Sequence, residues 1–351
     1  MTRVQGLIQS TVNKQHHAGR NQRVLWLAAC IALLGVVALL SILVGSRSLV
    51  PSVIGAALFS FDPRNDAHLV IWSLRIPRLI IGILAGAALG ASGAVMQALT
   101  RNPLAEPGLL GVNAGAAAAV ILGVAIGDIS NIHHYVWLAF AGAGLAGGAV
   151  IVLAAKGGHG PDPLRLVLAG AALSIILASL TGITLLNAPA AALDTFRNWA
   201  AGSFDGRDFD VAAVLALSVG CGLLICTMIA GNLNAVALGD DLGRALGVNL
   251  RRTLLLACLA VMLLAGSATA AAGPIGFVGL MAPHLARAVA GPDQRWILVF
   301  SAVMAALLLL VADIIGRVIA APSEVAAGIV TALIGGPFFL VIVRRTGVGK
   351  P

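Results

Sequence analysis

Long apolar runs separated by short polar breaks restrict the fold of this chain more than any other feature of its sequence. A helix needs about 20 apolar residues, at about 1.5 Å of rise each, to cross about 30 Å of hydrocarbon. Ten stretches approach that length, near residues 24–44, 76–98, 107–126, 135–155, 165–186, 211–230, 252–271, 274–290, 296–316 and 325–343. The pattern predicts an all-α integral membrane protein, a bundle of ten spans. The third and eighth stretches are the weakest, because both are short, rich in glycine and flanked by proline.

The charges between the runs predict the topology. Cytoplasmic loops of membrane proteins are enriched in Lys and Arg, and roughly two thirds of the 22 Lys and Arg fall on the side of the N-terminus. We therefore expect a multi-pass protein of the cytoplasmic (inner) membrane with both termini in the cytoplasm. Residues 1–23 would form a cytoplasmic tail, 24–345 a single transmembrane domain and 346–351 a second tail. Most acidic residues, including Asp205 and Glu324, fall on the outer side.

Composition argues against several other classes of protein. The net charge is +8, but the basic residues are spread thinly instead of forming the stripe that binds nucleic acid. None of the three lysines follows a GxxxxG motif, so the chain is not itself a P-loop ATPase. The sequence has no HExxH, no GxSxG and no paired mid-membrane carboxylates, which leaves no catalytic or metal site to assign. The scarcity of acids within the runs also disfavours self-powered transport.

Arginines on the outer side are the least expected charges. Arg75 and Arg78 begin the second run as RIPR, and Arg317 ends the ninth. An arginine at the bilayer centre costs about 2.5–3.5 kcal/mol, so these side chains must lie at an interface. They are either anchors that snorkel to lipid headgroups or an exposed docking surface for an acidic partner. Asp313 and Arg317 are four residues apart, which lets them pair near the outer end.

Three further segments have distinctive local patterns. Gly82, Gly86 and Gly90 place a flat stripe on one face of a helix, which favours close helix packing. Residues 102–106 lie between helix-breaking residues at the inner face, where they form either a gate loop or an ordinary turn. The segment ALGDDLGRALG, from Ala237, predicts a short amphipathic helix on the inner side. Its acidic start favours a groove on a cytoplasmic protein over an anionic membrane.

Four stretches together resemble the iron-siderophore and cobalamin permease family. They are LRIPRLIIGILAGAALGASGAVMQALTRNPLAEPGLLGVNAGA, ALGDDLGRALGV, AGPIGFVGLMAPHLARAVAGPDQRW and ADIIGRVIAAPSEVAAGIVTALIGGPFFL. The resemblance runs from about residue 26 to residue 345 in one order. Members of this family are the membrane subunits of binding-protein-dependent, type II ABC importers. The resemblance implies ten spans per subunit, two subunits around a central pathway, and an ABC ATPase dimer on the cytoplasmic side.

The resemblance also implies roles for particular residues. Arg75, Arg78 and Arg317 would dock glutamates on the two lobes of a periplasmic or lipid-anchored substrate-binding protein. The helix that couples the permease to the ATPase would comprise Leu238, Gly239, Asp240, Asp241, Leu242, Arg244, Ala245, Leu246 and Gly247. Asn102 and Leu104 match residues of the inner gate. A second gate loop would fall near residues 162–164, where the sequence reads GPDP and no role is carried over.

The resemblance implies ATP-driven import of a ferric siderophore, most like that of the ferric-catecholate permeases. It favours a heterodimer with a related second permease over a homodimer. No cofactor is expected on this chain, because ATP and Mg²⁺ would bind the partner ATPase. Two alternatives stay open: a cobalamin or haem permease of the same family, or a stand-alone secondary transporter that needs no ATPase. Besides these proteins and the chelate, the expected partner is membrane lipid.

Overall fold

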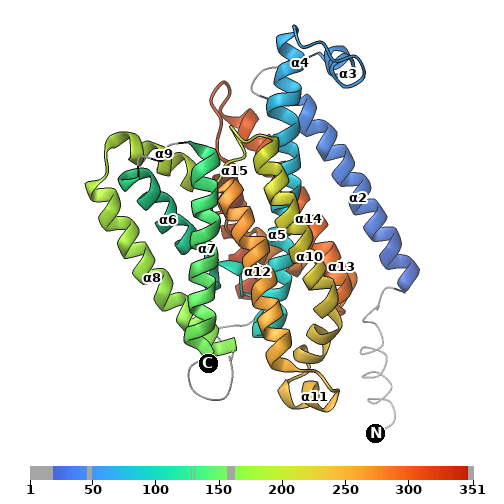
Figure 1. The fold of residues 1–351 in the computed structure, drawn as a ribbon. Coiled ribbons are helices and arrows are strands. Elements are labelled where there is room, and N and C mark those ends of the chain that lie inside the picture. The colour runs from blue at the N-terminus through green and yellow to red at the C-terminus, as the bar shows by residue number, and fades with distance from the viewer. Residues whose placement is uncertain (1–18, 46–49, 128, 130, 156–162, 347–351) are drawn as a thin grey trace.

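The computed structural model describes residues 19–45, 50–127, 129, 131–155 and 163–346, and within these ranges all regular structure is helical (Figure 1). The segments are α2 (Arg20–Leu43), α3 (Pro51–Phe59), α4 (Asp66–Val70), the π-helical turn η1 (Ile71–Arg75), α5 (Ile76–Thr100), the 3₁₀ turn η2 (Pro107–Leu110), α6 (Val112–Ile126), α7 (Ile132–Ala155), α8 (Pro163–Asn187), α9 (Ala190–Ala200), α10 (Phe209–Ala237), α11 (Asp240–Ala245), α12 (Leu250–Ala272), α13 (Val278–Ala290), α14 (Gln294–Ile319) and α15 (Ala327–Thr346).

Helix α5 lies at the centre of the bundle. It packs against α10, α12, α13 and α14, and most of its residues are buried. Helices α6, α7 and α8 form a second group, joined to the centre through α12 and α7 (Figure 1). Helix α2 and helix α8 lie at the periphery, where only 11% of each apolar window is buried inside the chain. Their apolar surfaces are therefore left for lipid or another membrane subunit.

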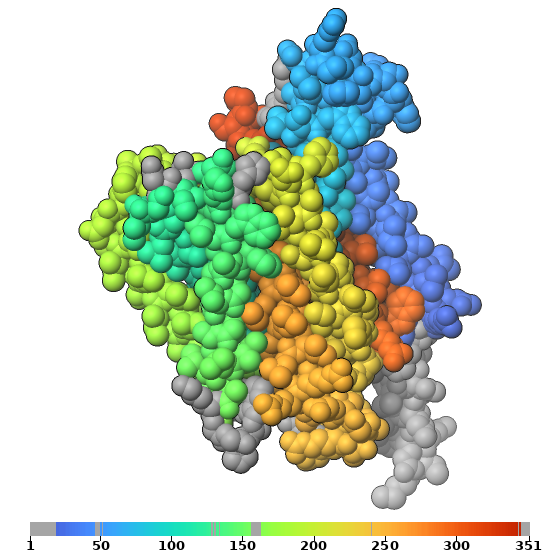
Figure 2. Space-filling view, viewed as in Figure 1, coloured from blue at the N-terminus to red at the C-terminus, as the bar shows by residue number. Residues whose placement is uncertain are grey.

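The two ends of the bundle differ. Helices α3 and α4 project at one end, and the short helix α11 projects at the other (Figure 2). We call these the α4 end and the α11 end. The start of α5 and the end of α14 lie at the α4 end, whereas the end of α5 and the start of α14 lie at the α11 end.

The predicted glycine stripe packs as expected. A side chain at Gly86 would overlap the backbone of Ala306, and one at Gly90 would overlap the backbone of Ser301, both on α14. At Gly82 an added Cβ would lie 2.9 Å from a methyl group of Leu310. The absence of side chains on this face lets α5 and α14 approach backbone to backbone, which sets the relative position of the two helices.

The all-α membrane class is confirmed. Among the described residues, seven helices are long and apolar enough to cross a membrane, namely α2, the continuous α4–α5 segment, α7, α8, α10, α12 and α14. Helix α6 and the apolar part of α15 are shorter, and α13 has 13 residues. The third, eighth and tenth predicted spans are these three helices, so the count of ten stays a prediction. The short helices α3, α4 and α9 were not predicted, because none is long enough to give an apolar run.

Candidate functional site

The three outer-side arginines converge at the α4 end. Arg75 ends the π-helical turn, Arg78 lies in the first turn of α5 and Arg317 lies in the last turn of α14. All three line one cavity of about 120 Å³, together with Gly45, Val70, Leu74, Asp205, Gly206 and Glu324. π-Helical turns often occur at functional sites. The structure thus brings together residues that are as much as 242 positions apart, counted from Arg75 to Arg317.

Arg78 is the centre of an ion-pair network. Its Nε and Nη2 atoms donate to Asp313 Oδ1 at 3.0 and 2.8 Å, and its Nη1 donates to Glu324 Oε2 at 2.7 Å. Asp205 lies 3.5 Å from the same Nη1 atom. The Asp313 side chain is only 2% exposed, whereas that of Asp205 is 73% exposed. Arg78 therefore holds one deeply buried carboxylate and faces two that are closer to solvent.

Arg75 and Arg317 both bind the C-terminal end of α2. Arg317 Nη1 donates to the carbonyl oxygens of Ser41 and Val44, each at 2.8 Å, and Nη2 donates to Ser41 Oγ at 2.7 Å. Arg75 Nη1 donates to the carbonyl of Ile42, and to that of Leu43 at 3.2 Å. The last carbonyls of a helix lack partners within the helix and carry partial negative charge, so two guanidinium groups here stabilise α2 in place.

This geometry changes the expectation for the arginines. The sequence predicts exposed guanidinium groups, but Arg75, Arg78 and Arg317 are 7%, 9% and 3% exposed in the chain, so the expectation of exposure is wrong. The physical reason is that charges at the end of a bundle are stabilised when they are paired and hydrogen-bonded. The predicted pairing of Asp313 with Arg317 is confirmed, at 3.0 Å. The docking role of Arg75, Arg78 and Arg317 stays a prediction.

Sequence reasoning missed the acidic partners in this cluster. It placed Asp205 and Glu324 on the outer side but assigned them no partner, although both contact Arg78. It also gave no role to Gly45, where an added Cβ would lie 2.8 Å from the Arg75 guanidinium. The available signal was the excess of acids on the same side as the three arginines. Three guanidinium groups and three carboxylates leave the cluster close to neutral instead of strongly positive.

A second cavity of about 540 Å³ lies beside the arginine cluster and shares Asp205 and Glu324 with it. Its polar lining includes Asn198, Ser203 and Arg207. Arg207 Nε donates to the Ala271 carbonyl at 2.7 Å, and burial lowers the pKa of this side chain. The cavity has a lining of polar and apolar residues and lies close to the cluster, and sequence reasoning did not find it because its walls come from separate segments.

The predicted gate loop lies at the α11 end. Helix α5 ends at Thr100, and the next residue, Arg101, has a φ of 51°. The Asn102 side chain accepts a hydrogen bond from the Leu104 amide at 2.9 Å. Asn102 is exposed and Leu104 half-buried. Burial raises the pKa of Glu106, which ends this loop. The left-handed residue and the side-chain turn fix the shape of the loop locally, while its action as a gate stays a prediction. Residue 162 of the second predicted gate loop lies outside the described residues.

A short helix forms where the amphipathic pattern predicts one. Helix α11 lies between Gly239 and Gly247, whose positive φ angles of 115° and 80° allow the chain to turn at both ends. Leu238, Leu242 and Leu246 are 62%, 56% and 65% exposed, and so do not pack against the rest of the chain. Three exposed leucines on and beside one short helix at the end of the bundle are typical of a surface that binds another protein.

Comparison with known proteins decides the family. The model of the FecCD transport family matches residues 33–345, which is nearly the whole chain. The chain belongs to the FecCD transport family. This FecCD chain is 44% identical over 316 residues to the ferric enterobactin transport system permease protein FepD of Escherichia coli K12, covering 90% of this chain and 93% of that protein.

A second curated relative and a solved structure also support the assignment to this family. It is 41% identical over 290 residues to the probable siderophore transport system permease protein YfiZ of Bacillus subtilis 168, covering 82% of this chain and 86% of that protein. Among solved structures it is similar to a metal-chelate type ABC transporter in an inward-facing conformation, with a TM-score of 0.79 and 27% identity. That likeness covers 91% of this chain and 98% of the other. The FecCD chain is thus a membrane permease by both sequence and fold.

Proposed function

We propose that this chain is the membrane-spanning permease subunit of an ATP-driven importer, and that its cargo is a ferric siderophore delivered by a substrate-binding protein. The observation that carries the proposal is the FecCD family match over residues 33–345, supported by relatives named for ferric enterobactin and other siderophores. The chain would supply a passage with two states and no covalent chemistry, and ATP hydrolysis would occur on a separate ATPase dimer with bound Mg²⁺.

The two ends of the bundle would bind different partners. At the α4 end, Arg75, Arg78 and Arg317 would receive carboxylates of the binding protein, and the cavity that contains Arg207 would receive the chelate. At the α11 end, the exposed leucines would enter a groove on the ATPase. Asn102 and Leu104, on the loop after α5, would close the inner gate. This assignment places the α11 end and both termini in the cytoplasm, in the cytoplasmic membrane.

The assembly would contain two permeases. The exposed apolar surfaces of α8 and α10 support contact with lipid and with a second subunit. A related second permease is favoured over a second copy of this chain, in keeping with the likeness to ferric-catecholate permeases. The domain assignment follows from the same function: residues 24–345 form the permease, between short cytoplasmic tails at 1–23 and 346–351.

Transport by purified components tests the proposal. Proteoliposomes would contain this chain with the ATPase and second permease that co-purify with it. We expect uptake of a ⁵⁵Fe-labelled catecholate siderophore from its binding protein only when ATP is present on the ATPase side. Liposomes with this chain alone should take up nothing. Cobalamin and haem, offered as competitors, test the other chelates that related permeases carry.

Two results would overturn the proposal. Accumulation of the chelate by the chain alone, without ATPase, would favour a secondary transporter. ATP-dependent uptake of cobalamin or haem in preference to every ferric siderophore would keep the importer but replace its cargo.

A further inference from the structure

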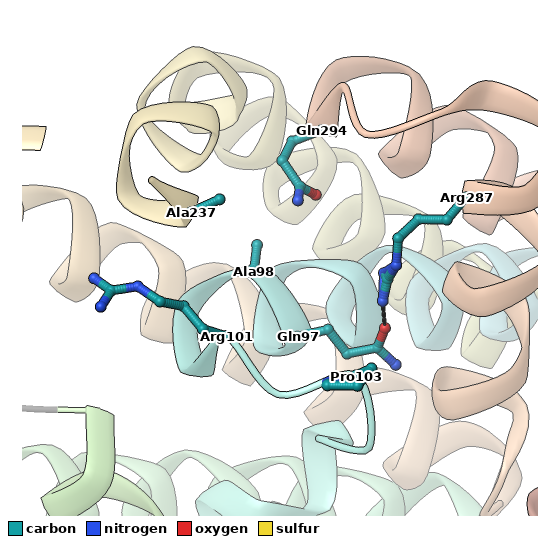
Figure 3. Close-up of a pocket in the computed structure, with 7 residues that line it drawn as sticks. All are labelled: Gln97, Ala98, Arg101, Pro103, Ala237, Arg287 and Gln294. Atoms are coloured by element: carbon teal, nitrogen blue, oxygen red, sulfur yellow. Dashed lines mark hydrogen bonds between the residues drawn. The ribbon is translucent and has the colours of Figure 1, made fainter. Parts of the chain in front are cut away.

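A cavity of about 260 Å³ opens at the α11 end, beside the predicted gate loop and the start of the predicted coupling segment (Figure 3). It is lined by Gln97, Ala98, Arg101, Pro103, Ala237, Arg287 and Gln294, from the end of α5, the following loop, the end of α10, α13 and the start of α14. A single buried water needs only about 10–15 Å³. The cavity therefore has room for a polar group much larger than one water molecule.

Arg287 gives this cavity a positive charge, and no acid in the described part of the chain balances it. Its Nη2 atom donates to the Gln97 side-chain oxygen, and Figure 3 shows these two groups pointing toward each other. Among the described residues, no carboxylate lies within ion-pair distance of Arg287. The guanidinium carries five N–H donors, and this hydrogen bond is its only one among the described residues. The arginine therefore retains donors for an anionic oxygen.

Gln294 is the second polar residue of the cavity whose hydrogen bonding is incomplete within the described part of the chain. Its side chain lies across the cavity from Arg287 (Figure 3), and the residue is only 8% exposed. The Gln294 Oε1 atom is buried and accepts no hydrogen bond from the residues that the structure describes. A buried amide oxygen without a donor is costly, because it has lost water without gaining a partner. Because Gln294 lines the cavity, a ligand there that carries a hydrogen-bond donor would supply the partner that this oxygen lacks.

The other charged side chains near the cavity already form hydrogen bonds within the chain. Arg101 lines the cavity but points its guanidinium away from Arg287 (Figure 3), and its Nε donates to the Val236 carbonyl at 2.9 Å. Asp293 precedes Gln294 but does not line the cavity. Its carboxylate accepts hydrogen bonds from Asn234 at 2.9 Å and from the Arg295 amide at 3.1 Å. The cavity thus presents one cation and one acceptor to a ligand.

We propose that this cavity binds a phosphate group that carries a hydrogen-bond donor close to its oxygens. Arg287 would bind two phosphate oxygens with its planar fork, and Gln294 would accept from the donor. Two sources have this chemistry: hydrogen phosphate itself, and a phospholipid headgroup such as phosphatidylglycerol, whose glycerol hydroxyls are donors. Basic pockets between transmembrane helices on the cytoplasmic side commonly bind lipid headgroups. The inference rests on the cavity and, for the lipid source, on the cytoplasmic position that the proposed function gives this end; it does not rest on the transported cargo.

Binding of phosphate to the purified full-length chain tests the proposal. In one arm, the chain lies in phosphatidylcholine nanodiscs, and binding of ³²P-labelled inorganic phosphate is measured by equilibrium dialysis. In the other arm, the nanodiscs contain phosphatidylglycerol and phosphatidylcholine, and native mass spectrometry measures which lipid stays bound. We expect binding in at least one arm. The Arg287→Gln variant should bind about tenfold more weakly or worse, since a charge-assisted hydrogen bond is lost.

Two further variants make the test selective. Gln294→Met removes the unsatisfied oxygen with little change in volume, so the variant should fold and bind several-fold more weakly, even if Arg287→Gln does not fold. Arg251→Gln removes an exposed arginine at the same end that does not line the cavity, and should bind like the unchanged protein. Binding in the first arm identifies the free anion, and binding in the second alone identifies the headgroup. No binding in either arm, or equal binding by Gln294→Met, would overturn the proposal.

Discussion

Arg78 and Asp313 are 235 positions apart in the sequence, and the Arg78 Nη2 atom lies 2.8 Å from Asp313 Oδ1. This pair fixes the start of α5 against the end of α14, at the point where Arg317 from α14 also binds the end of α2. Three helices are therefore joined by one buried polar network. The same arginines are the proposed docking residues, so stability and partner binding depend on the same side chains.

Removal of the central arginine tests the structural part of this network. Arg78→Gln should destabilise the chain by about 3–5 kcal/mol, because Asp313 would remain as a buried charge without its main partner. The double variant Arg78→Gln with Asp313→Asn should recover part of that loss, since the buried charge is also removed. Denaturant titration of the detergent-solubilised chain measures both. As a control, Arg197→Gln removes an arginine that is 74% exposed and should change stability by less than about 0.5 kcal/mol.

Neutralising Glu324 tests the docking role separately from folding. Glu324 is bound to Arg78 at 2.7 Å and its side chain is 27% exposed, so it occupies the position that an incoming carboxylate would take. Glu324→Gln should leave the buried Arg78–Asp313 pair intact and strengthen binding of the substrate-binding protein several-fold, measured by surface plasmon resonance at low salt, where charge interactions are screened least. The matched control is Asp210→Asn, an exposed acid at the start of α10. Unchanged or weaker binding by Glu324→Gln would contradict docking at Arg78.

The exposed leucines of the α11 segment give a prediction for the ATPase. Leu242→Ala combined with Leu246→Ala should abolish co-purification of the ATPase without lowering the melting temperature, because both side chains are more than half exposed in the chain. Leu224→Ala, on the apolar surface of α10 and 62% exposed, is the matched control and should co-purify normally. A double variant that retained the ATPase would place the coupling surface elsewhere.

The loop after α5 gives a prediction about pH. Burial raises the pKa of Glu106 above the ordinary value of 4.5, so the folded chain favours the protonated side chain. The stability that this protonation provides is complete below about pH 4.5 and is lost as the pH rises through the raised pKa. Glu106→Gln, which stays neutral, should therefore melt higher than the unchanged chain at pH 7, and the difference should vanish near pH 4.

A carboxylate outside the buried loop provides the comparison. Asp194→Asn alters a side chain that is 62% exposed, and at pH 7 it should change the melting temperature much less than Glu106→Gln does. If the Glu106→Gln variant melts lower than the unchanged chain at pH 7, the ionised carboxylate has a favourable partner, and the explanation by burial is wrong.

Local patterns in the sequence predicted the helices that carry the site. Apolar runs located the long helices, the glycine spacing predicted a close helix contact on one face of α5, and the ALGDDLGRALG segment predicted α11, because each of these features depends on neighbours within a few residues. That α14 makes the contact with α5 was not predicted. The same reasoning missed α9 and the π-helical turn, since neither produces a long apolar run. It also could not settle the number of membrane spans, because α6, α13 and the apolar part of α15 (Ala327–Ile342) are shorter than the apolar stretches that contain them.

The sequence by itself determined that this is a helical membrane protein, which residues form its long helices, and that arginines lie at one end of the bundle. Only the tertiary structure decided what those arginines bind. Arg78 meets Asp313 and Glu324, and Arg317 meets the end of α2, through contacts between segments hundreds of positions apart. Helix formation depends on local spacing and can be read along the chain. The pairing of buried charges depends on which helices pack together, and no local pattern encodes it.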